Sequence, residues 1–170
     1  IIGIDLGFKN PSAILWMAID DEGEIYVYRE FYKAGMNYRE LGETIVELSA
    51  NEHIEVAVAD TNIWKQEGNV GQAGSEVIQE IFQRKGIPVL KADKERVIGW
   101  QQVREALNPS PGMWGVMRSR LTISELCPNL IRTLPAAIHD KNRVEDVDSS
   151  GEDHLLDALR QPLEDRTISV

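Results

Sequence analysis

The hydrophobic positions in the first third of the chain follow the patterns of β-strands. Residues 1–5 and 12–20 are apolar runs, and residues 24–32 alternate tyrosines with other hydrophobic residues. A continuous apolar run is typical of a strand buried on both faces, whereas alternation indicates a strand with one face toward the core. Because residues 20–23 read as a tight turn, the pattern predicts an antiparallel meander of three strands.

The spacing then becomes helical. Asn37 and Glu40 resemble a capping box, and Leu41, Ile45 and Leu48 follow on one helix face. The later pattern predicts strands at 55–60, 87–91 and 120–123, and helices at 75–85, 94–107, 128–134 and from 153 to about 161, where Pro162 should close the last helix. A meander followed by strand–helix units predicts an α/β mixed sheet with helices on both faces.

Two aspartates stand at the carboxyl ends of predicted strands. Asp5 ends the first strand and Asp60 ends the strand at 55–60. Ligands of α/β sheets lie outside the carboxyl ends of strands, so the two carboxylates are expected to face one site. Taken singly, each aspartate is equally explained as a loop residue that accepts hydrogen bonds from nearby backbone N–H groups.

The last predicted helix adds more carboxylates. Asp153, Asp157 and Arg160 share one face at helical spacing, while leucines cover the opposite face. One interpretation is structural, with Asp153 as an N-cap and Asp157 paired with Arg160. The other is that the helix packs on the sheet and completes an all-oxygen site, which suits Mg²⁺ or Mn²⁺. Two such ions about 4 Å apart would activate a water and stabilise the leaving oxygen of a phosphodiester. Without metal, the carboxylates should repel one another.

Charge is unevenly distributed along the chain. The net charge is −10, but residues 84–120 hold eight basic against three acidic residues. We therefore expect one basic face on an acidic body, with weak, salt-sensitive DNA binding by the isolated domain. The predicted phosphate contacts are Lys91, Lys94, Arg96, Arg104, Arg118 and Arg120.

Four further residues have simpler expected roles. Cys127 is the only cysteine, which leaves no disulfide, and we expect it to be a small buried hydrophobe. Trp64 and Trp100 are expected to pack in the interior, whereas Trp114 lies on a predicted loop where it could contact DNA or a partner protein.

Several segments resemble one known family. Residues 3–7, 59–64 and 151–160 are similar to the C-terminal nuclease domain of tailed-bacteriophage terminase large subunits, of the RNase H-like superfamily. Residues 96–107 and 127–132 resemble it too. The most specific piece is the Asp-His-x-x-Asp-Ala-Leu-Arg pattern that begins at residue 153.

The resemblance implies an RNase H-like fold and a set of metal ligands. Asp5 and Asp60 would bind Mg²⁺ or Mn²⁺, and either Asp153 or Asp157 would be the third ligand. A histidine at the position of His154 lies near the site in some relatives, but we expect His154 to be a helix-surface or boundary residue.

The resemblance also implies a biological role. It implies a metal-dependent endonuclease that cuts concatemeric double-stranded DNA during genome packaging, in the cytoplasm of the infected bacterial host. Residues 1–170 would be a single domain excised from a longer chain with an N-terminal ATPase domain, and the partners would include a small terminase subunit and the portal. No Gly-x-x-x-x-Gly-Lys-Ser/Thr loop is present, so this segment is not the motor. No membrane association is expected.

Three alternatives stay open at this stage. A Holliday-junction resolvase or transposase core would use the same carboxylates. An actin- or chaperone-like phosphate-binding ATPase module shares the Ile4–Gly7 pattern with Asn10, but needs a second lobe and a second glycine-rich loop. A structural domain that kept the fold without activity is the third.

Overall fold

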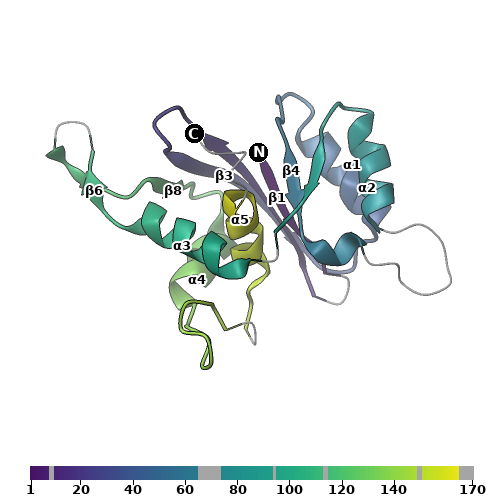
Figure 1. The fold of residues 1–170 in the computed structure, drawn as a ribbon. Coiled ribbons are helices and arrows are strands. Elements are labelled where there is room, and N and C mark those ends of the chain that lie inside the picture. Colours follow the sequence, from purple (N-terminus) through teal and green to yellow (C-terminus); the bar gives the residue numbers. More distant parts are fainter. Residues whose placement is uncertain (8–9, 65–73, 94, 113–114, 149–150, 165–170) are drawn as a thin grey trace.

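The computed structural model describes residues 1–7, 10–64, 74–93, 95–112, 115–148 and 151–164 (Figure 1). Its strands are β1 Ile2–Asp5, β2 Ser12–Ile19, β3 Ile25–Lys33, β4 Ala57–Ala59, β5 Val89–Lys91, β6 Ser110–Pro111, β7 Met117–Arg118 and β8 Leu121–Ile123. Its α-helices are α1 Tyr38–Leu48, α2 Gly74–Gln83, α3 Arg96–Leu107, α4 Pro128–Thr133 and α5 His154–Glu164, with 3-10 turns η1 at Thr61–Trp64 and η3 at Leu134–Ala136.

Six strands form one mixed sheet in the order β5-β4-β1-β2-β3-β8. The strands β1, β2 and β3 pair antiparallel, β4 and β5 continue parallel to β1, and β8 pairs parallel with β3. This confirms the predicted α/β mixed sheet and its three-stranded meander. It also places the carboxyl ends of β1, β4 and β5 at one edge, because parallel strands end on the same side.

Alternation along β2 divides the core into two layers. Ile14 and Trp16 pack on one face with residues of α1 and α2, whereas Leu15 and Met17 pack on the other with residues of α3, α4 and α5. Figure 1 shows the same division, with α1 and α2 on one side of the sheet and α3, α4 and α5 on the other. All four β2 residues are at most 1% exposed, as the continuous apolar run predicts.

Helix α5 lies directly against β1 because both contact residues are small. A Cβ added at Gly3 would stand 1.9 Å from the carbonyl oxygen of Ala158, so only glycine allows this approach. Pro162 has no N–H for the Ala158 carbonyl four residues earlier, and that same carbonyl faces Gly3. The close packing fixes the position of α5 over the end of β1.

Helix boundaries were predicted well where local chemistry sets them. The capping box at Asn37 and Glu40 is present in both directions, and Gly86 follows α2 with a φ of 68°. One prediction was wrong, because α5 continues through Pro162 to Glu164. Beyond α3, β6 and β7 form a small hairpin that the sequence patterns did not predict. None of the helices in the described ranges is long and apolar enough to span a membrane.

Candidate active site

Asp5 at the end of β1 is the centre of the site. Its side chain is buried, and His154 Nδ1–H donates to Asp5 Oδ2 at 2.7 Å. Burial raises the pKa of Asp5, as do the nearby charges of Asp157 and Asp60, while the hydrogen bond from His154 acts in the opposite direction. The pKa of His154 is raised chiefly by the hydrogen bond to Asp5. His154 is half-buried, with 20% of its side chain exposed, as expected of a boundary residue, and it also contacts the first of the predicted site carboxylates.

Asp60 lies beside Asp5 because their strands are parallel neighbours. Ile4 and Ala59 are register partners, and the backbone N–H of Asp60 donates to the carbonyl of Ile4 at 3.0 Å. The charge of Asp60 is one cause of the raised pKa of Asp5. The two strand ends thus bring their carboxylates into one electrostatic environment, as predicted.

Asp153 precedes the first turn of α5. Its carbonyl accepts the backbone N–H of Asp157 at 2.8 Å, and its side chain is only 9% exposed. Burial, followed by the charges of Asp157 and Asp5, raises the pKa of Asp153 to about 6. The raised pKa values of Asp5 and Asp153 agree with the predicted repulsion among these carboxylates.

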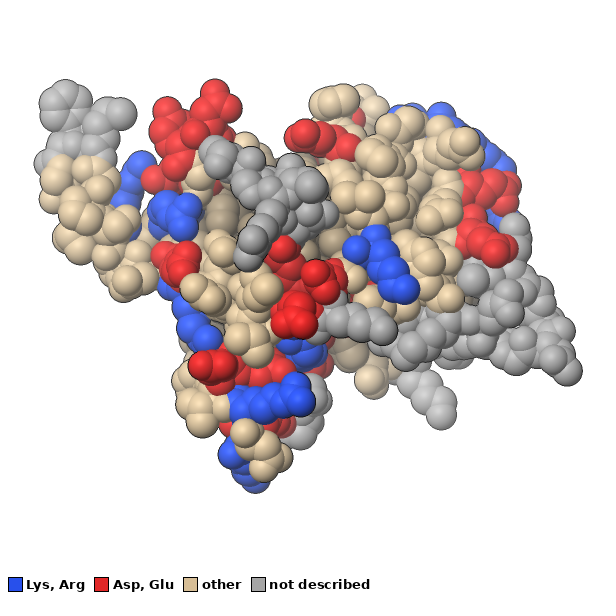
Figure 2. All heavy atoms as spheres, viewed as in Figure 1, with Lys and Arg blue, Asp and Glu red and all other residues tan. Residues whose placement is uncertain are grey.

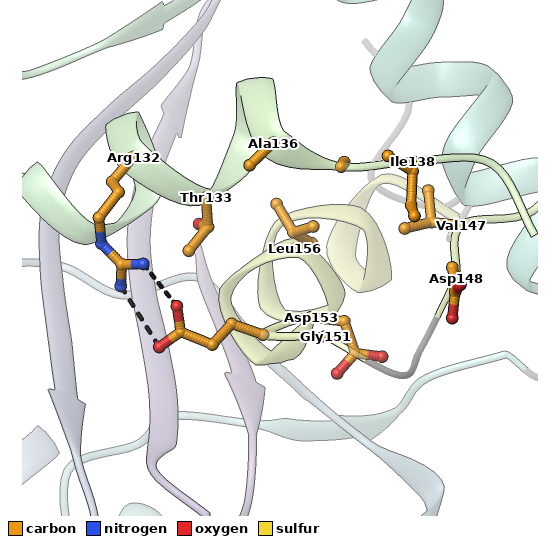
Figure 3. A pocket seen from close by; sticks show the side chains of 11 residues that line it. Arg132, Thr133, Ala136, Ile138, Val147, Asp148, Gly151, Asp153 and Leu156 are labelled. Carbon is orange, nitrogen blue, oxygen red and sulfur yellow. Dashed lines mark hydrogen bonds and ion pairs between the residues drawn. The ribbon is translucent and has the colours of Figure 1, made fainter.

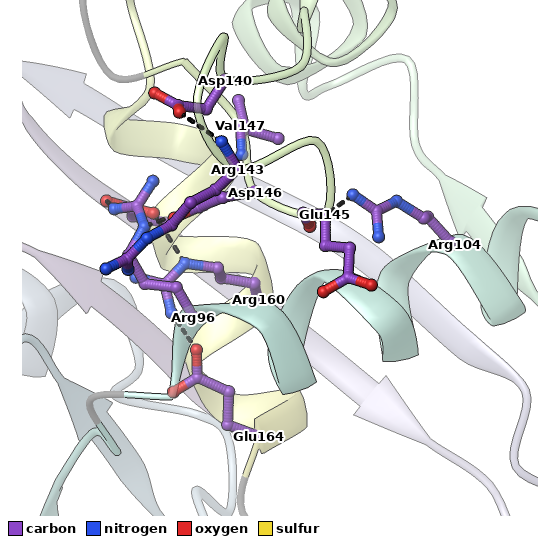
Figure 4. A network of polar contacts seen from close by, with 10 residues as sticks. Arg96, Arg104, Asp140, Arg143, Glu145, Asp146, Val147, Arg160 and Glu164 are labelled. Atoms are coloured by element: carbon purple, nitrogen blue, oxygen red, sulfur yellow. Dashed lines mark hydrogen bonds and ion pairs between the residues drawn. The ribbon is translucent and has the colours of Figure 1, made fainter.

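Asp157 is held by two arginines. Arg160 Nε donates to Asp157 Oδ1 at 2.7 Å, and Arg96 Nη1 donates to Oδ2 at 3.1 Å. Arg160 also pairs with Glu164, and Arg96 with Asp146 (Figure 4). The structural interpretation of Asp157, a pair with Arg160, is therefore confirmed for this arrangement.

The donor set suits a hard divalent cation. Carboxylate oxygens are the ligands that Mg²⁺ and Mn²⁺ prefer, and a cation would offset the burial and the mutual repulsion that together raise the pKa values of Asp5 and Asp153. Within the described residues, no three His, Cys, Asp or Glu side chains converge into a ready metal cluster. Both oxygens of Asp157 accept hydrogen bonds from guanidinium groups in this arrangement.

A pocket adjoins Asp153 on the side of α4. Its floor is apolar, with Leu156 and Val147, and its rim carries Asp153 and the ion pair between Arg132 and Glu152 (Figure 3). Arg132 Nη1 donates to Glu152 Oε2 at 2.5 Å. The negative charge of Glu152, which precedes Asp153 in the sequence, is therefore neutralised by Arg132.

The five predicted phosphate contacts within the described residues do not share one surface. Lys91 is the last residue of β5 and pairs with Ala59, so it lies at the same ends of the parallel strands as Asp60. Its ammonium group is 5.8 Å from the centroid of the Trp64 ring. Arg104 is exposed and donates to the carbonyl of Glu145.

Arg118 and Arg120 lie at the opposite ends of the strands from the carboxylates. They bind Glu24 and the carbonyl of Gly23, next to the start of β3. Asp5 pairs with Ala13 of β2, and Ile25 at the start of β3 pairs with Ile19 of β2. Ala13 and Ile19 are about 20 Å apart along β2 at 3.3 Å per residue, and so are Asp5 and the start of β3. These two arginines are therefore remote from the carboxylates.

The expected placement of Arg96 also needs correction. Arg96 was predicted as a phosphate contact, but it is half-buried and pairs with Asp146 and Asp157. Lys94 falls outside the described residues. Figure 2 shows acidic and basic side chains intermingled on the face that it draws, so the described residues there form no continuous basic surface.

The remaining single-residue predictions concern burial. Trp100 is 3% exposed and Cys127 is fully buried, as predicted. Trp64 packs partly buried against the core on the α1 and α2 side. Trp114 lies outside the described residues.

Comparisons with known proteins agree on the family and the fold. The sequence model of the terminase RNaseH-like domain matches residues 2–165. No curated protein matches the chain.

Three solved structures of bacteriophage proteins are similar. The large terminase of a thermophilic bacteriophage has a TM-score of 0.69 at 17% identity, over 98% of this chain and 39% of that one. The nuclease domain of the P22 large terminase has a TM-score of 0.68 at 15% identity, over 98% and 80%. The nuclease domain of the bacteriophage SPP1 large terminase, with bound Mn, has a TM-score of 0.62 at 17% identity, over 96% and 84%.

The chain spans well under half of the large terminase from the thermophilic bacteriophage. At these identities the structural likeness establishes the fold, which is the predicted RNase H-like one. The family match covers nearly all of the sequence, and it favours the terminase prediction over the resolvase and ATPase alternatives. This chain belongs to the family of terminase RNaseH-like domains, a family with a nuclease fold.

Proposed function

We propose that this domain is a metal-dependent endonuclease that hydrolyses double-stranded DNA and cuts concatemeric phage DNA during genome packaging. The observation that carries the proposal is the proximity of Asp5, Asp60 and the first turn of α5, where the charges of Asp157 and Asp60 add to the burial that raises the pKa of Asp5. Manganese in the SPP1 nuclease structure supports Mg²⁺ or Mn²⁺ as the cofactor here.

In this proposal, Asp5 and Asp60 hold the cation, with Asp153 or Asp157 as the further carboxylate. When bound, the cation supplies Lewis acidity toward the scissile phosphate and a nucleophilic water. His154 orients Asp5 through the 2.7 Å hydrogen bond. Lys91, at the same ends of the parallel strands, would contact a phosphate of the DNA backbone, and Arg104 is a second exposed candidate.

The partners follow from the family membership. We propose that the domain acts within a longer large-terminase chain that carries an ATPase domain, and that the assembly includes a small terminase subunit and the portal. The setting would be the cytoplasm of an infected bacterium.

Plasmid digestion in Mn²⁺, Mg²⁺ or EDTA tests the catalytic proposal. Asp5→Asn and Asp60→Asn should each lower the cleavage rate at least about 100-fold, because each removes a charged ligand of the cation. Asp21→Asn makes the same chemical change on the exposed turn before β3 and should keep full activity. Equal cutting in EDTA, or full activity in both site variants, would contradict the proposal.

Substrate preference tests the terminase role separately. The wild-type domain should cut linear duplex DNA at least as fast as a four-way junction of the same arm sequences. A strong preference for the junction would favour a resolvase activity instead.

A further inference from the structure

The two arginines that hold Asp157 are themselves held in different ways. Arg160 lies on α5, is 3% exposed, and has its other end fixed by Glu164. Glu164 in turn occupies the space beside Gly99 of α3, where an added Cβ would stand 2.6 Å from the carboxylate. The contact of Arg160 with Asp157 Oδ1 is therefore enclosed and supported from behind.

Arg96 reaches Asp157 from another element and is less constrained. It is the first residue of α3, its side chain is 28% exposed, and it bridges Asp146 and Asp157. Its Nη2 is buried and makes no hydrogen bond within the described residues. A buried donor without a partner is costly, so this arrangement of Arg96 is not its most favourable one. Of the two partners of Asp157, Arg96 is the one that can leave.

Arg96 also acts electrostatically on the rest of the site. Its charge lowers the pKa of Asp153, against the burial that raises it. Burial lowers the pKa of Arg96, but the charges of Asp157, Asp146 and Asp153 outweigh it, so that this pKa is raised. A positive group thus already partly neutralises the carboxylates around Asp5, which is the task that a divalent cation would perform.

We propose that Arg96 is the internal counter-ion of Asp157 and competes with the divalent cation for Asp157 Oδ2, thereby setting the metal affinity of the site. The inference rests on the proposed function, because it requires a cation at these carboxylates. Bound metal and the Arg96–Asp157 pair exclude each other, and metal binding turns the Arg96 side chain away from Asp157. Arg96 is thus a positioning residue that acts through Asp157.

Mn²⁺ binding measured by calorimetry, without DNA, tests the competition. Arg96→Gln should bind Mn²⁺ about tenfold more tightly than wild type, because a competing charge is removed. Arg96→Lys keeps that charge and should stay close to the wild-type affinity. Arg84→Gln removes the same charge from an exposed side chain at the end of α2, where Arg84 pairs with Glu80, and should leave the affinity unchanged. Weaker or unchanged Mn²⁺ binding by Arg96→Gln would overturn the inference.

A second measurement uses the wild-type domain and so does not depend on how a variant folds. A Mg²⁺ titration followed by ¹⁵N NMR of the arginine side chains should shift the Arg96 Nε resonance with saturation and leave that of Arg104 in place. An Arg96 resonance that does not respond to saturating Mg²⁺ would refute the competition. If the wild type binds no divalent cation at all, the proposed function fails. If the wild type binds a cation and Asp5→Asn abolishes that binding, but Arg96→Gln does not bind Mn²⁺ more tightly and the Arg96 resonance does not shift, only this inference fails.

Discussion

Replacement of Gly3 by alanine tests the contact that holds α5 on the sheet. The new Cβ would stand 1.9 Å from the carbonyl oxygen of Ala158 and 3.0 Å from Pro162 Cγ. Ordinary contact begins near 3.4 Å, so α5 has to move away from β1 by about 1.5 Å. Both elements are backbone at this point, and neither can give way by a side-chain rotation. Overpacking of this kind typically costs about 1–3 kcal/mol, and we expect the upper half of that range.

Stability is the first measurement. A loss of about 2–3 kcal/mol in a domain of this size lowers the Tm by roughly 5–10 °C, which thermal unfolding resolves easily. The control is Gly151→Ala, where an added Cβ meets no atom within 4 Å, and its Tm should match that of wild type.

The site gives the second measurement. His154 is on α5 and Asp5 on β1, so the same movement lengthens their 2.7 Å hydrogen bond. The pKa of His154, raised chiefly by that bond, should fall toward its usual value in an NMR titration. Cleavage should drop by about 100-fold at a temperature where the variant is folded, since misplacement by 1 Å has effects of this size. A Gly3→Ala variant with an unchanged Tm and an unchanged His154 titration would refute the reasoning.

Two further predictions concern stability away from and within the site. Ser49 Oγ accepts the indole N–H of Trp16 at 2.8 Å in the core, so Ser49→Ala should lower the free energy of unfolding by about 1–3 kcal/mol in urea titrations. Thr44→Ala removes an exposed hydroxyl from α1, the helix that Ser49 follows. It should cost less than half as much, and equal losses would contradict this. The pKa of Asp153 is raised to about 6, so between its usual 3.8 and 6 the folded state holds this proton more tightly than the unfolded state. Without divalent cations, stability should therefore fall as the pH rises through this window, and Asp153→Asn should flatten the profile; parallel Tm profiles for the two proteins would count against the buried carboxylate.

The sequence alone predicts the elements whose signals are local. The alternation in β3, the capping box at Asn37 and the glycine after α2 all specify structure within a few residues, and each is confirmed. The pairing of β8 with β3 could not be predicted in this way, because three residues carry no information on their partner. The end of α5 was misplaced for a related reason. Proline breaks a helix by leaving a carbonyl unbonded and by steric clash, and here that carbonyl lies against Gly3 instead.

For the site, the sequence indicates which carboxylates meet but not what else surrounds them. Asp5 and Asp60 could be placed because strand ends converge in a parallel sheet. The ion pairs of Arg96 join residues 50 and 61 positions apart, and no local pattern reports such pairing. The position of His154 between Asp153 and Asp157 was a signal that it lies near the site. The helical spacing that groups Asp153, Asp157 and Arg160 on one face does not include His154, so it did not predict the contact with Asp5.

The contact between β1 and α5 also bears on when the site can exist during protein synthesis. Asp5 and His154 are 149 residues apart, and ribosomes add roughly 5–20 residues each second, so about 7–30 s separate their appearance. For that interval the sheet can form its meander while the end of β1 has neither His154 nor the carboxylates of α5 beside it. If the proposed function is correct, a nascent or prematurely terminated chain would therefore not cleave DNA, and cleavage competence would arrive only with α5.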